Sequence, residues 1–461
     1  MNRQNNDNIK ATSDWLASNP VFYNEKTNVF SENINDVIDF KNLEFDPEGL
    51  AAYLDFGYSV FGQTPVKNLK FLLPNSQLEL IDNKISISQN NDDAINLLHQ
   101  NTNEDDVIDL LKDKVQQWEK SLNDDIIIPL SGGFDSRILT TFINDKTRIH
   151  AFTYGLDNNK NKSRDIVYAK KLSEIYDIDW SPVKLGYFHN YIPQCYNMFG
   201  VSANLTANYH FEFFDKIQAL HPCKMNLLSG IIGDAWAGAF SVPPVNSIND
   251  LKILGHTHGI NADVSQLLFS SKKELYDEYF EREKNNLNDP LYRIIASMRY
   301  KLIFLCLLYR IPKHYGYQAW SPFLDKDVAI AMLNLPADRR LNRMWQRDYF
   351  KKIGTNVEDM NLPYSRTNSL NNMAIKLVPL KPLNPDILKE IIKPDYINWI
   401  NKQLTSNSIV KGFYNKLMYT PLIKGGLQLM GCKNRYMEAY NAYQTIKPLE
   451  QLLVSRNENN E

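Results

Sequence analysis

The chain has 461 residues, 43% of them hydrophobic, so it is long enough for two or three domains and apolar enough to build a sizeable core. Its 51 basic and 53 acidic residues give a formal net charge of −2, which argues against a nucleic-acid-binding protein. The N-terminal sequence MNRQNNDNIK lacks a secretory h-region, and the apolar run at 302–309 is far shorter than the roughly 20 residues that cross a bilayer. We therefore expect a cytoplasmic protein that binds neither membrane nor nucleic acid.

The first part of the chain predicts a small β-rich module, which we place at residues 1–95. The predicted strands are residues 69–73, 77–81 and 84–88. The last two are joined at Asp82 and Asn83, which predicts a tight hairpin. A helix is predicted over Pro47–Phe56, with Asp46 as its N-cap and a proline at the first helical position.

From about residue 100 the pattern changes to helices that alternate with strands. Residues 105–122 carry apolar side chains at helical spacing, which predicts an amphipathic helix. The next predicted elements are strands at 125–130, 148–154 and 225–228, and helices at 136–143 and 163–176. This alternation predicts a parallel sheet covered on both faces. Beyond residue 272 the chain reads mainly as helices, so we expect an α/β domain over residues 100–455 with a helical C-terminal half.

The string SGGFDS lies between the first strand of this region and its helix, and it predicts a phosphate-binding loop. Gly132 and Gly133 have no Cβ, so backbone N–H groups can approach an anion closely. The helix that follows adds the partial positive charge of its N-terminus. Ser131 and Ser136 supply hydroxyl donors, and Asp135 supplies an anionic ligand for Mg²⁺ on the phosphates. An ordinary strand-to-helix turn is the alternative, but the complete SGGxDS string after an apolar strand favours the phosphate loop.

This loop resembles that of the N-type ATP pyrophosphatases, whose members activate a substrate oxygen with ATP and usually release AMP and pyrophosphate. Three further stretches, in the same order, resemble asparagine synthetase-like proteins: FDPEGLAAYLDFGYSVFGQTPVKNLKFLLPNSQLEL, LLSGIIGDAWAGAF and GYQAWSPFLDKDVAIAMLNLP. The first is similar to the end of their glutaminase domain, the second to their LSGEGSDEVFGGY-like loop, and the third to their GxEARxPFLD segment. The resemblance covers roughly residues 20–350.

The resemblance implies an adenine nucleotide alpha hydrolase-like synthetase domain over residues 100–455, preceded by a truncated, glutaminase-like module over residues 1–95. It implies that ATP and Mg²⁺ bind, with residues 131–136 on the ATP phosphates and the metal shared by Asp135 and Asp234. The residues that it implies for the adenosine pocket are Thr153, Tyr154, Ser229 and Gly230.

The chain departs from the family pattern at the groups that handle protons. The family's glutaminase begins with a nucleophilic cysteine, whereas Asn2 stands here, so we expect no glutamine hydrolysis by this chain. Ile231 takes the place of a glutamate in the synthetase loop, and Gln318 replaces the glutamate of the GxEAR motif. Arg366 lies about where the family carries a lysine, and arginine is not a proton donor at neutral pH. Candidates for catalytic contacts are Gln318, Arg310 and Arg366, although Arg310 fits a structural ion pair as well.

The resemblance therefore implies an ATP-dependent ligase that adenylates a carboxylate and transfers an amine or ammonia. The alternative is a catalytically decayed nucleotide-binding scaffold or regulatory protein of the same fold. We favour the enzyme, because the loop aspartate serves only to hold the metal and would be lost early if catalysis had decayed. The expected partners are a small-molecule or peptide carboxylate and an amine-supplying or biosynthetic protein. Free aspartate, a sugar acid and a natural-product precursor remain open as the acceptor.

Overall fold

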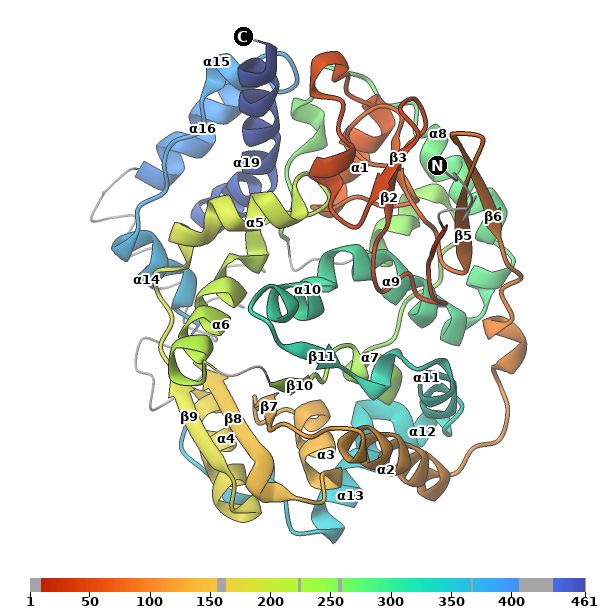
Figure 1. Cartoon of the computed structure of the whole chain (residues 1–461), viewed down its shortest axis with the longest axis vertical. Coiled ribbons are helices and arrows are strands. Elements are labelled where there is room, and N and C mark those ends of the chain that lie inside the picture. Colours follow the sequence, from red (N-terminus) through yellow and green to blue (C-terminus); the bar gives the residue numbers. More distant parts are fainter. Residues whose placement is uncertain are drawn as a thin grey trace, which may run out of the picture.

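A computed structural model of the chain describes residues 10–155, 163–222, 225–255, 259–365, 368–405 and 434–460 (Figure 1). Its strands form two three-stranded antiparallel sheets near the N-terminus and one five-stranded parallel sheet. Within these ranges, no helix is long and apolar enough to cross a membrane.

The N-terminal module holds the two antiparallel sheets. The first has the order β1-β5-β6 and the second β3-β2-β4, and the strands are β1 Lys10–Thr12, β2 Phe22–Asn24, β3 Val29–Ser31, β4 Leu69–Phe71, β5 Ser76–Ile81 and β6 Lys84–Gln89. The β5–β6 hairpin turns at Asp82 and Asn83, whose φ angles of 48° and 60° are those that a two-residue turn requires. Helix α1 (Pro47–Phe56) begins at Asp46, whose side chain accepts from the backbone N–H of Gly49 at 2.7 Å. The predicted hairpin and the predicted helix cap are confirmed.

The five-stranded sheet has the order β11-β10-β7-β8-β9, and every neighbouring pair is parallel. Its strands are β7 Ile126–Pro129, β8 Ile149–Tyr154, β9 Asp179–Val183, β10 Asn226–Leu228 and β11 Gln318–Trp320. The isoleucines of central β7 are fully buried, which is why this strand reads as a continuous apolar run. The edge strands β9 and β11 are additions to the predicted sheet.

Helices cover this sheet, as the alternating pattern predicts. The helices up to the end of β10 are α2 Glu104–Lys120, α3 Phe134–Phe142, α4 Arg164–Tyr176, α5 Ile192–Phe199 and α6 Asn208–Leu220. Helix α3 packs on β7, α4 on β8 and β9, and α6 on β9. Helix α7 (Gly233–Ala237) follows β10 and contacts α3, which brings the chain after two neighbouring strands together.

The remaining chain is mainly helical: α8 Glu274–Glu283, α9 Pro290–Leu305, α10 Leu307–His314, α11 Lys326–Leu333, α12 Ala337–Arg340, α13 Met344–Lys352, α14 Leu370–Leu377, α15 Pro385–Leu388, α16 Pro394–Thr405 and α19 Arg435–Asn460. The apolar run at 302–309 does not form one helix, because the chain bends at Cys306 between α9 and α10. Helix α19 lies beside the N-terminal module, where the Tyr53 hydroxyl donates to the Thr445 carbonyl at 3.0 Å (Figure 1). One hydrophobic core runs through the module, the parallel sheet and these helices.

Candidate nucleotide-binding site

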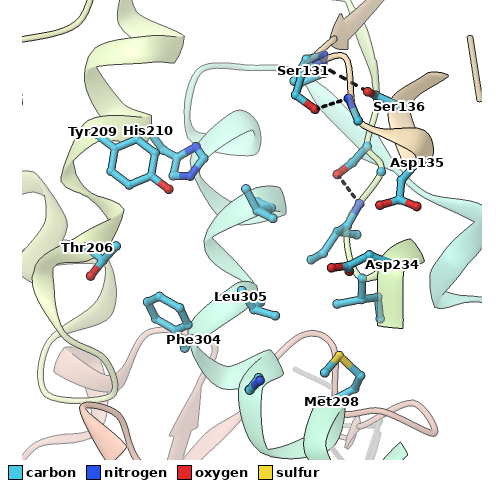
Figure 2. Close-up of a pocket in the computed structure, with 18 of the residues that line it drawn as sticks. Ser131, Asp135, Ser136, Thr206, Tyr209, His210, Asp234, Met298, Phe304 and Leu305 are labelled. Atoms are coloured by element: carbon cyan, nitrogen blue, oxygen red, sulfur yellow. Dashed lines mark hydrogen bonds between the residues drawn. The ribbon is translucent and has the colours of Figure 1, made fainter. Parts of the chain in front are cut away.

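A cavity of about 1210 Å³ lies at the carboxyl ends of β7, β8 and β10 (Figure 2). In open α/β sheets ligands bind at this edge. A pocket for a single small molecule usually holds about 300–1,000 Å³. The cavity therefore has room for a nucleotide and a second ligand.

The loop after β7 forms the polar end of this cavity. The backbone N–H of Ser131 donates to Ser136 Oγ at 3.4 Å, and the N–H of Gly133 donates to Ser131 Oγ at 3.3 Å (Figure 2). Gly133 is also the N-cap of α3, and among the described residues no side chain caps that helix. The first N–H groups of α3 are therefore left to bind an anion in the cavity.

Gly132 and the buried Arg137 fix the shape of this loop. Gly132 has φ of +71°, and a Cβ there would lie 2.4 Å from the Cβ of Tyr168, so only glycine fits. Gly132 itself does not line the cavity. Its carbonyl accepts from Nη2 of Arg137 at 2.7 Å. The fully buried Arg137 guanidinium donates two hydrogen bonds of 2.8 Å to the Glu358 carboxylate, and this pair anchors the loop.

A second loop, after β10, lies directly against the first. A Cβ on Gly230 would come within 3.1 Å of the Asp135 Cβ and of the Ser136 backbone nitrogen. The N–H of Ser229 donates to the Trp320 carbonyl of β11 at 2.8 Å, and the Ser229 hydroxyl accepts from the N–H of the next residue but one, Ile231. Ser229, Gly230 and Ile231 all line the cavity, so the two loops form one continuous wall.

Asp135 on α3 and Asp234 on α7 lie on this wall (Figure 2). Burial, together with the negative charge of Asp234, raises the pKa of Asp135 from 3.8 to about 7. Arg343 opposes this rise, because its Nη1 lies 3.2 Å from Asp135 Oδ1. Two neighbouring carboxylates in one cavity are oxygen donors of the kind that Mg²⁺ prefers, and a cation would relieve their repulsion. The residues present therefore fit a divalent metal.

Thr153 and Tyr154, at the end of β8, also line the cavity. The Thr153 hydroxyl is used within the fold, since it donates to the Leu130 carbonyl and accepts from Trp180 Nε1 at 2.9 Å. The ring of Tyr154 packs edge-on against Phe213, with centroids 5.2 Å apart. Burial raises the pKa of Tyr154 well above its usual value, so the hydroxyl stays protonated.

Two of the three candidates for catalytic contacts do not join this site. Gln318 begins β11 at the amino end of the sheet, opposite the loops, and it is exposed. Arg310 on α10 donates to the Met198 carbonyl at 3.1 Å and lies over the Phe199 ring, so its contacts are structural. Neither residue lines the cavity. Arg366 lies outside the described residues.

Residues of α6 and α9 form the other walls, and sequence reasoning did not identify them. Figure 2 shows Tyr209 and His210 of α6 on one side of the cavity, and Met298, Phe304 and Leu305 of α9 on another. Burial lowers the pKa of His210 to about 3, so its imidazole is neutral. These positions read as ordinary core residues, because an apolar cavity wall has the same helical spacing as a packed face.

A separate cluster of possible metal ligands lies at the opposite edge of the sheet. One ligand atom from each of His150, Asp179 and His221 falls within 4.8 Å of the others. Both ring nitrogens of His150 already contact carboxylates, Asp179 at 2.8 Å and Asp125 at 3.3 Å. This cluster lies at the amino ends of β8 and β9 and so does not belong to the cavity.

No protein-family model matches the chain, and no curated protein matches it. Among solved structures, the NH3-dependent NAD synthetase from Campylobacter jejuni subsp. jejuni NCTC 11168, in complex with the nitrate ion, is similar to part of the chain. The TM-score is 0.24 and the sequence identity is 16%, over 43% of this chain and 93% of that chain. At this level the likeness carries no argument about function, which rests on the site residues alone.

Proposed function

We propose that this protein is an ATP-dependent ligase of the asparagine synthetase type, which adenylates a carboxylate and passes the acyl group to an amine or ammonia. One observation carries the proposal. A glycine-containing loop at an uncapped helix N-terminus and two neighbouring carboxylates lie at one end of a cavity with room for a second ligand. Part of the same proposal is that residues 1–95 are a truncated glutaminase-like module and residues 100–455 the synthetase domain.

In this proposal the loop residues Ser131, Gly133 and Ser136 bind the ATP phosphates, and Asp135 and Asp234 hold Mg²⁺. The metal, when bound, neutralises negative charge on the phosphates. A carboxylate oxygen of the acceptor attacks the α-phosphorus, and the bond between that phosphorus and the bridging oxygen to the β-phosphate breaks. Pyrophosphate leaves with the bonding electrons, and the loop N–H groups and the N-terminus of α3 stabilise its charge.

The second half-reaction has a different requirement, because an attacking ammonium or amine must lose protons. Ile231, at the position where the asparagine synthetase-like pattern has a glutamate, is 4% exposed and cannot accept one. We also propose that this chain hydrolyses no glutamine, because Asn2 stands where the family pattern has its nucleophilic cysteine. We therefore propose that the amine arrives from solution, from a partner protein, or as part of the substrate.

Calorimetry with Mg-ATP tests the nucleotide site. Wild type should bind, and the Asp135→Ala, Asp234→Ala double variant should lose most of the affinity, because it removes both metal ligands. Asp113→Asn, on an exposed face of α2, is the matched control for charge loss and should bind as wild type does. Equal affinity of wild type and the double variant would refute the assignment.

Exchange of labelled pyrophosphate into ATP tests the ligase. A panel of carboxylates should contain at least one that supports exchange, and Asp135→Ala should abolish it. Ile231 favours a second candidate, a decayed nucleotide-binding scaffold, because it removes a proton acceptor from the site. If ATP binds tightly but no carboxylate of the panel supports exchange, the proposed function should be the decayed scaffold and not the ligase.

A further inference from the structure

The cavity changes character between its two ends. The wall formed by the two loops carries hydroxyl and carboxylate groups, whereas one face of α9 and the start of α10 line the cavity with residues spaced by one, three or four positions: Ser297, Met298, Lys301, Phe304, Leu305 and Leu308. Further apolar side chains from other segments complete this part: Phe240, Val242, Ile253 and Ile260. An apolar wall of this extent does not suit phosphates or a sugar, so it fits the second ligand better than the nucleotide.

Lys301 is a cation on this apolar wall. Its Nζ lies 5.5 Å from the ring centroid of Phe240, and among the described residues it has no ion pair and no hydrogen bond. Lys252, the other lysine that lines the cavity, is instead paired with Asp55 at 2.6 Å. Burial lowers the pKa of Lys301, while the charge of Asp234 raises it. Lys301 and Asp234 line the same cavity, so the lysine shares it with the candidate metal site.

A structural role does not account for this lysine. Lys301 is half-buried, and holding an unpaired ammonium against an apolar wall costs free energy. A leucine or methionine would complete the apolar face of α9 without that penalty. An anionic group on a ligand in the cavity would complement this ammonium.

We propose that Lys301 binds the carboxylate of the acceptor substrate and that this acceptor is an apolar carboxylate, such as a medium-chain acyl or aryl-alkyl acid. The apolar body of the acceptor lies against α9, and its carboxylate lies between Lys301 and the Asp135–Asp234 wall. The inference rests on the proposed ligase and makes its acceptor an amphiphile rather than free aspartate or a sugar acid.

Binding of decanoate to the full-length chain tests the inference directly. Wild type should bind decanoate more tightly than the neutral decanamide. Lys301→Met keeps the length of the side chain and removes its charge, so decanoate affinity should fall about 10-fold or more, as expected for a lost charge-assisted hydrogen bond. Decanamide affinity should not change. Lys313→Met makes the same change at an exposed position of α10, outside the cavity, and should leave both affinities as they are.

The inference is overturned by equal decanoate affinity in wild type and Lys301→Met, by equal affinity of wild type for decanoate and decanamide, or by no decanoate binding by wild type. Titrating Mg-ATP and pyrophosphate into the same variants shows whether Lys301 binds the carboxylate of the acceptor or the phosphates of the nucleotide. A loss confined to these phosphates in Lys301→Met would make Lys301 a nucleotide contact and would also overturn the inference. Decanoate binding that depends on Lys301 in a protein without pyrophosphate exchange would support the subsite while refuting the ligase.

Discussion

Replacing Asp135 with asparagine should stabilise the protein in the absence of metal and nucleotide. The Asp135 side chain is 17% exposed, and burial with the nearby charge of Asp234 raises its pKa from 3.8 to about 7. The folded chain therefore holds this proton at pH values where the unfolded chain has released it. Stability is lost as the pH rises through this window, and the loss is complete above a pH of about 7. Asparagine has a similar shape and cannot ionise.

The size of the effect follows from linkage. Each unit of pKa shift corresponds to about 1.4 kcal/mol. The shift from 3.8 to about 7 gives an upper limit of about 4 kcal/mol at pH 8. At pH 5.5 the unfolded carboxyl is ionised and the folded one is not, which leaves about 2 kcal/mol. The favourable contact with Arg343 is already contained in this pKa.

Denaturant unfolding in the presence of a chelator measures the prediction. Asp135→Asn should unfold at higher denaturant than wild type at pH 8, and its advantage should fall by about half at pH 5.5. Asp113→Asn controls for the loss of a surface charge. The reasoning is wrong if Asp135→Asn is no more stable than wild type at pH 8, or if its advantage is the same at both pH values.

Three further changes test the surroundings of the site. Gly132→Ala should destabilise the protein more than Gly354→Ala. The φ angles are +71° and +73°, so both alanines incur left-handed backbone strain of about 1–2 kcal/mol. A Cβ at Gly354 meets no atom within 4 Å, whereas a Cβ at Gly132 would lie 2.4 Å from the Cβ of Tyr168. Thermal unfolding compares them, and equal losses would contradict the packing argument. Glu358→Gln should destabilise the protein by about 3–5 kcal/mol and weaken Mg-ATP binding, because it leaves the buried Arg137 without a carboxylate partner. If denaturant unfolding shows that the free energy of unfolding falls by less than about 1 kcal/mol, this anchor is dispensable. His210, whose pKa falls to about 3, is neutral when folded but protonates when unfolded below pH 6.5, so it makes the protein less stable as the pH falls. Between pH 6.5 and pH 5 the free energy of unfolding of His210→Phe should fall by about 2 kcal/mol less than that of wild type. Identical dependence of stability on pH in the two proteins would contradict this prediction.

The elements that the sequence predicts are those whose signals are local. Asp46 caps α1 from three residues away, and the apolar run of β7 follows from burial on both faces. Strand β9 escaped prediction because DWSPV is short, shows no clear alternation of apolar and polar residues, and contains a proline, which is uncommon within strands. Strand β11 has three residues in a mainly helical region, too few to show a period.

The site divides in the same way. The loop residues and Asp234 each follow a strand of the sheet, so their meeting at one edge follows from the topology. Lys301 comes from a helix that begins more than 60 residues beyond β10, and only tertiary packing brings it to the cavity. Gln318 was placed by motif alone, and the register of β11 puts it at the other end of its strand from the loops.

In the proposed metal site, Arg343 and a divalent ion would compete for Asp135, whose Oδ1 lies 3.2 Å from Arg343 Nη1. Arg343 is held in a left-handed conformation, with φ of 57°, just before α13, and its guanidinium lies over the Phe134 ring. The neighbouring chain is tied to the end of α7, because a Cβ on Gly238 would lie 2.2 Å from the Arg340 carbonyl oxygen. A divalent ion at the proposed site would compete for Asp135 with this guanidinium, whose segment packs against the helix that carries the second carboxylate. Metal binding would therefore act on the short connection before α13 as well as on the two carboxylates.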